Sequence, residues 1–224
     1  MRLLDLFCGA GGAAMGYHRA GFTEIVGVDL RPQPRYPFDF VQADALTFPL
    51  EGFDAIHASP PCQFASVATP MAYRPLHPNL IPAIRARLQD AGVPAVIENV
   101  PNARRHLQEP MVMLCGSMFG LQVWRHRYFE GVHFIPPAAP YTCNHITTDL
   151  VTAPPGSNAR KARANRAPVL VTGTTRRKDG GRFEFSTEEK RQAMQIDWMV
   201  KTELDEAIPP AYTEFIGRRL LEAL

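Results

Sequence analysis

An apolar strand that runs directly into a glycine-rich turn restricts the possible folds of this chain more than any other segment. Residues 2–7 (RLLDLF) are apolar apart from Arg2 and Asp5, a composition typical of a strand buried on both faces. Three glycines within residues 9–12 (GAGG) follow at once. They permit a tight bend at which a ligand can approach the main chain. With a helix predicted over residues 13–19, the unit is typical of nucleotide-binding α/β sheets.

Strands and helices alternate through the first hundred residues. Apolar segments predict strands over residues 24–29, 38–42, 53–58 and 94–100, and a helix is predicted over residues 80–91. This order predicts an α/β fold with a doubly wound, mostly parallel sheet. Ligands bind such sheets at the carboxyl ends of the strands. The chemistry-bearing residues at these ends are Asp29, Asp44, Cys62 and Glu98.

The second half of the chain divides at about residue 131. Residues 131–185 are rich in proline, glycine and basic residues and show little periodicity, which predicts a small inserted lobe. Regular structure resumes with a capping-box pattern at residues 186–189 (STEE), and Pro210 begins a final amphipathic helix. We therefore predict one catalytic, cofactor-binding domain from residues 1–130 and 186–224.

Composition predicts a cytoplasmic protein without a membrane span. No apolar run is long enough to cross a bilayer, no leader pattern is present, and the four cysteines show no disulfide spacing. The net charge of +2 is too small to indicate nucleic-acid binding by itself. Basic residues nevertheless cluster in the inserted lobe, where a solvated loop and a phosphate-binding surface are equally compatible with the charge. The two clusters include Arg160, Lys161, Arg163, Arg176 and Arg177.

Cys62 is the candidate nucleophile. It follows a predicted strand in the run 59–63 (SPPCQ), and the two prolines indicate a loop rather than a core strand. A thiolate on such a loop can attack an electron-poor ring carbon. A small buried apolar role is the commoner fate of a lone cysteine, but it fits this loop poorly.

Glu98 and two arginines are the candidate partners of that cysteine. Glu98 ends an apolar strand, where burial raises a carboxyl pKa and permits proton donation at neutral pH; an ion-paired or capping role is the alternative. Arg125 and Arg127 are alternate residues, which share a face if the segment is a strand. They could hold a base oxygen or a phosphate and lower a thiol pKa, or they could blunt an edge strand.

No metal site is predicted. Residues 143–145 (CNH) lack a second ligand pair at structural-zinc spacing. At the glycine turn, Asp29 has the position of a carboxylate that holds an adenosine ribose. Asp44 could accept a hydrogen bond from an adenine amino group or simply cap a turn.

Taken in this order, these motifs resemble those of the DNA (cytosine-5-)-methyltransferase family, as a short member with a reduced target-recognition region. Residues 5–12 (DLFCGAGG) resemble the first motif, 60–62 (PPC) the catalytic loop, 98–100 (ENV) the motif that contacts the pyrimidine, and 125–127 (RHR) the end of an arginine signature. The resemblance covers residues 1–130 and 186–224. It implies methyl transfer from S-adenosyl-L-methionine to carbon 5 of a flipped-out cytosine in double-stranded DNA, by a monomeric protein.

The resemblance also implies roles for individual residues. The implied catalytic residues are Cys62, Glu98, Arg127 and Arg125. The implied cofactor-binding residues are Phe7, Gly9, Ala10, Gly11, Gly12, Asp29, Leu30, Asp44, Ala45 and Pro60. Implied DNA contacts are Gln63, Ser66, Arg160, Lys161, Arg163, Arg176 and Arg177, and residues 64–74 are the implied mobile loop.

Three departures separate the chain from the family pattern. Val123 stands where the signature glutamine falls, residues 210–213 (PAYT) replace the usual Gly-Asn-Ser-Val, and the target-recognition region at 131–185 is short. Two alternatives remain open at this stage. One is modification of RNA cytosine or another carbon-5 pyrimidine modification, and the other is a non-catalytic DNA-binding pseudoenzyme.

Overall fold

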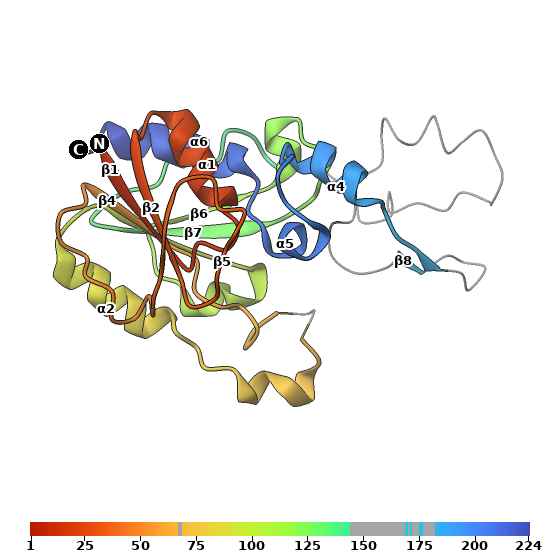
Figure 1. The fold of residues 1–224 in the computed structure, drawn as a ribbon, viewed down its shortest axis with the longest axis horizontal. Helices are drawn as coiled ribbons and strands as arrows, with labels where there is room; N and C mark the ends of the chain where they lie inside the picture. Colours follow the sequence, from red (N-terminus) through yellow and green to blue (C-terminus); the bar gives the residue numbers. More distant parts are fainter. Residues whose placement is uncertain (67–68, 144–168, 170, 172–174, 177–181) are drawn as a thin grey trace.

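A seven-stranded, mostly parallel sheet forms the centre of the molecule (Figure 1). The computed structural model describes residues 1–66, 69–143, 169, 171, 175–176 and 182–224. The strand order is β3-β2-β1-β4-β5-β7-β6, in which only β7 is antiparallel to its two neighbours. The strands are β1 (Arg2–Leu6), β2 (Glu24–Asp29), β3 (Asp39–Gln42), β4 (Ala55–Ala58), β5 (Ala95–Asn99), β6 (Met111–Leu114) and β7 (Arg127–Val132). The predicted fold class is confirmed.

Helices cover both faces of the sheet, with α1 and α6 on one face and α2 on the other (Figure 1). The helices are α1 (Gly12–Ala20), α2 (Ile81–Ala91), α4 (Thr187–Met194), α5 (Lys201–Glu206) and α6 (Pro210–Leu221). Short 3₁₀ segments lie at Met71–Leu76, Pro101–His106 and Gly116–Phe119, and β8 (Thr175–Arg176) pairs with β9 (Arg182–Phe183). Among the described residues, no helix has the length and apolar character needed to cross a membrane.

Helix α6, near the C-terminus, packs against α1, the first helix of the chain. Thr213 on α6 donates a hydrogen bond to the Ala13 carbonyl on α1, over 2.8 Å. This close approach depends on Gly16, where a Cβ would lie 2.0 Å from the Thr213 hydroxyl oxygen. Residues 210–213, which depart from the expected last motif, therefore still pack the final helix against α1, the helix that follows the glycine turn.

The direction of strand order reverses between β1 and β4, and this point determines where a ligand can bind. β1 pairs with β2 on one side and with β4 on the other, all in parallel. The helices that follow β1 and β4 leave on opposite faces, so the carboxyl ends of these two strands border a crevice. The glycine turn follows β1, and the loop that carries Cys62 follows β4.

Candidate active site

Asn99 anchors the loop that carries Cys62. Its side-chain amide donates a hydrogen bond to the Pro60 carbonyl over 2.9 Å, and Asn99 is only 1% exposed. On the other side of the cysteine, the Cys62 carbonyl accepts hydrogen bonds from the amides of Ala65 and Ser66 at 2.9 and 2.8 Å. The thiol is thus held between a fixed proline segment and a tight turn. Sequence reasoning did not single out Asn99, because its role depends on a carbonyl 39 residues away.

Glu98 and Arg127 form a buried ion pair. Glu98 lies on β5, is 6% exposed, and its Oε1 is 2.9 Å from Nε of Arg127. The β5–β7 register pairs Glu98 with Phe129, so Arg127 is the diagonal neighbour two residues along the same face. A paired guanidinium and carboxylate in this position can hold a planar polar ring.

Arg125 contacts the C-terminal segment of the chain. It lies before β7 and its guanidinium donates to the Asp205 carbonyl over 2.6 Å, while its own carbonyl accepts a hydrogen bond from the Tyr212 hydroxyl over 2.7 Å. Burial and the neighbouring charge of Arg127 lower the pKa of Arg125 to about 9. The two arginines therefore have different contacts: Arg127 contacts Glu98, whereas Arg125 connects the segment before β7 to the C-terminal segment.

Burial has the largest effect on the pKa values of both Glu98 and Cys62. It raises the pKa of Glu98, against the lowering effects of Arg127, Arg125 and Ser59. Burial also raises the pKa of the Cys62 thiol, and Glu98 adds to that rise, whereas Arg127 lowers it. The sequence led us to expect that the arginines lower the thiol pKa. Arg127 does have this effect, but the effect of burial is larger, so the net shift of the Cys62 pKa is upward.

A chain of hydrogen bonds leads from Tyr17 through His57 and Ser59 to Glu98. The Tyr17 hydroxyl is 2.9 Å from His57 Nδ1, and His57 Nε2 is 2.8 Å from the Ser59 hydroxyl, which hydrogen-bonds to Glu98. Burial lowers the pKa of His57 to about 3 and raises that of Tyr17, so both are neutral. With Ser59 donating to the carboxylate, each earlier member donates to the next: Tyr17 to His57, and His57 to Ser59.

We predict that Ser59→Ala moves the acid limb of the pH–rate profile to higher pH. For a reaction in which Glu98 acts in its protonated form and Cys62 as the thiolate, the acid limb follows the lower pKa of the two, that of Glu98. Loss of the serine hydrogen bond removes a stabiliser of the carboxylate and raises this pKa. The profile of kcat against pH measures the shift. Thr23→Ala, at the opposite end of the sheet, is the control, and an acid limb unchanged by Ser59→Ala would contradict the relay.

The glycine turn and Asp29 form the second half of the site. The Gly9 amide donates to Oδ2 of Asp29 over 3.1 Å, and the Arg31 amide donates to Oδ1 over 2.9 Å. Phe7 and Gly9 have φ values of 58° and 49°, and a Cβ at Gly9 would meet nothing within 4 Å. The main chain at Gly9 therefore borders open space, next to a carboxylate that keeps further acceptor capacity.

The other predicted cofactor residues have varied surroundings. Ala10, Gly11 and Gly12 lie buried in the turn, and a Cβ at Gly12 would lie 2.4 Å from the Ile208 carbonyl oxygen. Leu30 is 70% exposed beside Asp29, and Ala45 is buried. Asp44 accepts a hydrogen bond from the Leu46 amide over 2.9 Å, so the structure gives it the turn-capping role. Its contact with adenine stays a prediction.

Two residues near the turn were missed from sequence. Asp5 is fully buried with Oδ2 accepting from the Tyr36 hydroxyl over 3.2 Å, and burial raises its pKa to about 8. Its other oxygen has no hydrogen-bond partner among the described residues. Trp198 donates to the Ala10 carbonyl over 2.8 Å and joins the C-terminal segment to the turn. An aspartate inside an apolar strand was the signal available for Asp5.

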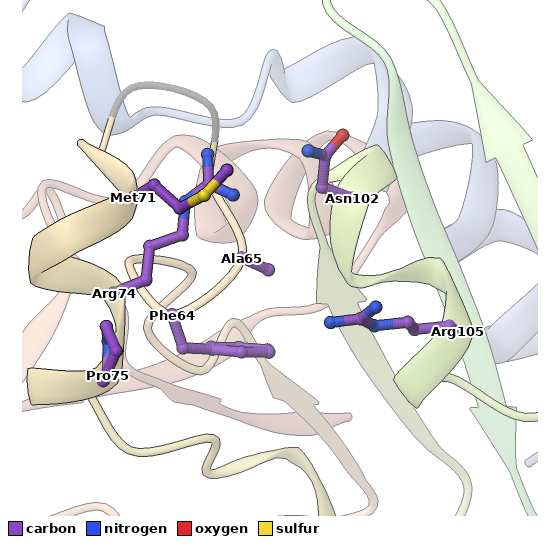
Figure 2. Close-up of a pocket in the computed structure, with 7 residues that line it drawn as sticks. All are labelled: Phe64, Ala65, Met71, Arg74, Pro75, Asn102 and Arg105. Atoms are coloured by element: carbon purple, nitrogen blue, oxygen red, sulfur yellow. The ribbon is translucent and has the colours of Figure 1, made fainter.

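A hollow lies beside the loop that carries Cys62. Figure 2 shows Arg74 and Arg105 on opposite sides of it, with Phe64 and Ala65 between them. Ala65 is the residue whose amide contacts the Cys62 carbonyl. Sequence reasoning did not identify these two arginines as a pair, because they lie in separate 3₁₀ segments.

The predicted DNA contacts are described only in part. Gln63 and Ser66 flank the catalytic turn, and the Gln63 side-chain oxygen is buried without a hydrogen-bond partner among the described residues. Arg176 lies in β8. Arg160, Lys161, Arg163 and Arg177 lie outside the described residues, so their role stays a prediction.

Comparison with known families agrees with this arrangement. The family model described as C-5 cytosine-specific DNA methylase matches residues 1–112, which contain the glycine turn, Cys62 and Glu98. The chain belongs to this family. As a C-5 cytosine methylase it is a methyltransferase, and its family chemistry depends on S-adenosylmethionine. No curated protein sequence matches it.

Solved structures share the fold of this methylase over its whole length. A protein of an E. coli prophage, described as a DNA modification methyltransferase, has 16% identity and a TM-score of 0.61, covering 100% of this chain and 99% of the other. DNMT2 of Spodoptera frugiperda has 13% identity and a TM-score of 0.63, covering 98% and 99%. Dnmt2 of S. pombe has 14% identity and a TM-score of 0.56, covering 99% and 98%.

Proposed function

We propose that this methylase transfers a methyl group from S-adenosylmethionine to carbon 5 of cytosine in DNA, through a covalent adduct with Cys62. The observation that supports it best is the joint position of Cys62, Glu98 and Arg127 beside the glycine turn. A base held there faces a thiol, an acid and a guanidinium at once. The same edge of the sheet leaves room for a nucleoside cofactor.

The residues around the turn fit S-adenosylmethionine. Open space beside Gly9 allows a ligand to reach the main chain. The Asp29 carboxylate has remaining acceptor capacity, which suits the two hydroxyls of a ribose. Exposed Leu30 offers an apolar surface for the adenine ring. When bound, this cofactor supplies a methyl group on a sulfonium, and carbon 5 of the substrate adduct takes it.

The first chemical step is nucleophilic addition. A stacked cytosine exposes neither ring face, so the base must leave the duplex to reach Cys62. The thiolate forms a bond to carbon 6 while protonated Glu98 donates to ring nitrogen 3, which accepts the displaced electrons. Arg127 keeps Glu98 oriented toward the ring. Nucleophilic character then passes to carbon 5.

The second step restores the aromatic ring. After carbon 5 is methylated, it still carries its original hydrogen, which leaves as a proton and passes to solvent water. The electrons of that C–H bond form the 5,6 double bond, and the Cys62 sulfur departs from carbon 6. Glu98 takes back the proton from nitrogen 3, so the enzyme returns to its starting state.

We also propose residues 131–185 as the target-recognition region, and Arg74 and Arg105 as contacts to the DNA backbone beside the catalytic loop. The two guanidiniums lie at the hollow of Figure 2, next to the turn that carries Cys62. A flipped nucleotide brings its flanking phosphates close to this loop. Arginine forks suit phosphate oxygens.

The double variant Arg74→Gln/Arg105→Gln should bind DNA more weakly and with less salt dependence. Each lost phosphate contact lowers the slope of log K against log salt by about 0.9. DNA-binding titrations at several salt concentrations measure the slope. Arg218→Gln removes a 67%-exposed charge from α6 and is the matched control. An unchanged slope in the double variant would show that these arginines do not contact phosphates.

Substrate assays with labelled cofactor test the proposed function. We expect label to enter cytosine of duplex DNA, with 5-methylcytosine as the product. Equal amounts of single-stranded DNA and tRNA complete the comparison. Preferential labelling of tRNA would replace DNA by RNA as the substrate, and no labelling of any nucleic acid would favour a pseudoenzyme.

A further inference from the structure

Two cysteines and a histidine meet at the edge of the sheet near the active site. The sulfurs of Cys115 and Cys143 and a ring nitrogen of His126 all lie within 4.8 Å of one another. His126 Nε2 is 3.2 Å from the Cys143 sulfur. Cys115 is fully buried after β6, and the other two side chains are partly exposed. None of the three belongs to the proposed methyl-transfer site.

The spacing of these atoms suits a small cation. A point exists within about 2.8 Å of any three atoms that are mutually no more than 4.8 Å apart, and zinc requires roughly 2.3 Å to sulfur and 2.0–2.1 Å to nitrogen. Shifts of less than about 1 Å, within ordinary side-chain adjustment, bring all three ligands into range. A fourth, tetrahedral position remains for a water molecule.

The chemistry of the donors selects the metal. Two thiolates and a neutral imidazole balance the double charge of Zn²⁺, and this donor set is far softer than magnesium or calcium prefers. The Ser117 hydroxyl lies 3.2 Å from the Cys115 sulfur and 3.9 Å from the Cys143 sulfur. Such an outer hydrogen-bond donor to a ligand sulfur is typical of metal centres. We propose that Cys115, His126 and Cys143 hold a Zn²⁺ ion.

The sequence concealed this site because its ligands come from three separate segments. Cys115 follows β6, His126 precedes β7, and Cys143 lies 17 residues after His126. The short-range ligand pairs of common zinc motifs are absent, so the spacing argument predicted no metal. The antiparallel pairing of β6 and β7 is what brings Cys115 and His126 together.

The ion would stabilise the segment that carries Arg127. His126 stands between Arg125 and Arg127, and its carbonyl accepts a hydrogen bond from the Arg127 guanidinium over 2.8 Å. Fixing His126 thus fixes the segment from which Arg127 reaches Glu98. Cys143 would tie the start of the proposed target-recognition region to the same point. Three protein ligands with an open fourth position are more typical of catalytic zinc sites, but the proposed methyl-transfer residues lie outside the cluster, so the role of the ion is to hold this segment in place.

Metal analysis of the untagged, full-length protein tests the site. After expression in zinc-containing medium, we expect about one Zn²⁺ per chain, the stoichiometry of a single structural centre. Cys143→Ala removes a partly exposed ligand and should lose zinc affinity by more than the roughly 10- to 100-fold that loss of an outer partner costs. Cys62→Ala is the matched control, since it removes one thiol outside the cluster and should retain the metal.

Cobalt substitution provides a readout that does not depend on activity or on the variants' folding. Co²⁺ added to the metal-free wild type should produce the thiolate charge-transfer band and the intense visible bands of tetrahedral coordination. Zn²⁺ should abolish these bands and raise the unfolding temperature of wild type but not of Cys143→Ala. Octahedral cobalt spectra, or wild-type zinc affinity equal to that of Cys143→Ala, would overturn the proposal. So would a native Cys115–Cys143 disulfide.

Discussion

Cys62→Ala should lose methyl transfer almost completely, by at least about 10⁴-fold in kcat, because the proposed mechanism requires the covalent adduct at Cys62. Without addition at carbon 6, carbon 5 of cytosine is not nucleophilic enough to attack a sulfonium. Incorporation of labelled methyl groups into DNA measures the loss. Cofactor binding should persist, since Cys62 is not a member of the glycine turn.

Covalent trapping separates loss of the nucleophile from loss of structure. Duplex DNA containing 5-fluorocytosine blocks proton loss from carbon 5, so wild type with cofactor should form an adduct that survives denaturing electrophoresis. The same duplex with ordinary cytosine is the control and should yield no lasting adduct. An adduct that persists in Cys62→Ala would assign the nucleophile to another residue.

Much of the framework was predictable because apolar periodicity and turn residues encode it locally. The predicted strand at 94–100 is β5 (Ala95–Asn99), and the predicted helix at 80–91 is α2 (Ile81–Ala91). The capping box at Ser186 forms as its pattern indicates: the Ser186 hydroxyl accepts from the Glu189 amide over 3.2 Å. Each of these features depends on residues within a few positions of one another.

The polar network behind the site was not predictable on the same grounds. His57 lies in a strand whose other residues are apolar, and only the folded sheet shows that Tyr17 and Ser59 satisfy its two nitrogens. Asn99 likewise stabilises a loop that is remote in sequence. Hydrogen bonds between distant segments leave no periodic pattern, although a buried polar residue implies a partner.

Arg125 and Arg127 belong to one sequence motif but have different contacts in the fold. Alternate residues share a face only within a strand, and β7 begins at Arg127, so the argument does not extend to Arg125. Arg125 instead contacts Asp205 and Tyr212, in a segment that sequence alone does not place beside it. The catalytic assignment of Arg127, like those of Cys62 and Glu98, stays a prediction until variants are measured.

Glu98→Gln should reduce kcat by about 10²- to 10⁴-fold, the range expected for loss of a positioned general acid. Glutamine keeps the shape of the side chain and can donate a hydrogen bond, but it cannot transfer a proton to nitrogen 3. Burial raises the pKa of Glu98, so the protonated form exists closer to neutral pH than for an ordinary carboxyl. In the variant only the Cys62 thiol still titrates, so the acid limb should move from the pKa of Glu98 to the higher pKa of the thiol, and the alkaline limb should disappear.

Glu130→Gln distinguishes this catalytic loss from the cost of breaking any buried ion pair. Glu130 lies on β7 and is 1% exposed, and its carboxylate accepts hydrogen bonds from Arg85 over 2.7 Å and from the Gln108 amide over 2.8 Å, neither of which belongs to the proposed site. Both variants leave a buried guanidinium without its charged partner, and breaking such a pair costs about 3–5 kcal/mol of stability. Thermal unfolding should therefore report a lower midpoint for both, whereas kcat at a temperature where each is folded should fall only for Glu98→Gln. Equal losses of kcat would mean that Glu98 acts through stability alone and that nitrogen 3 receives its proton from another group.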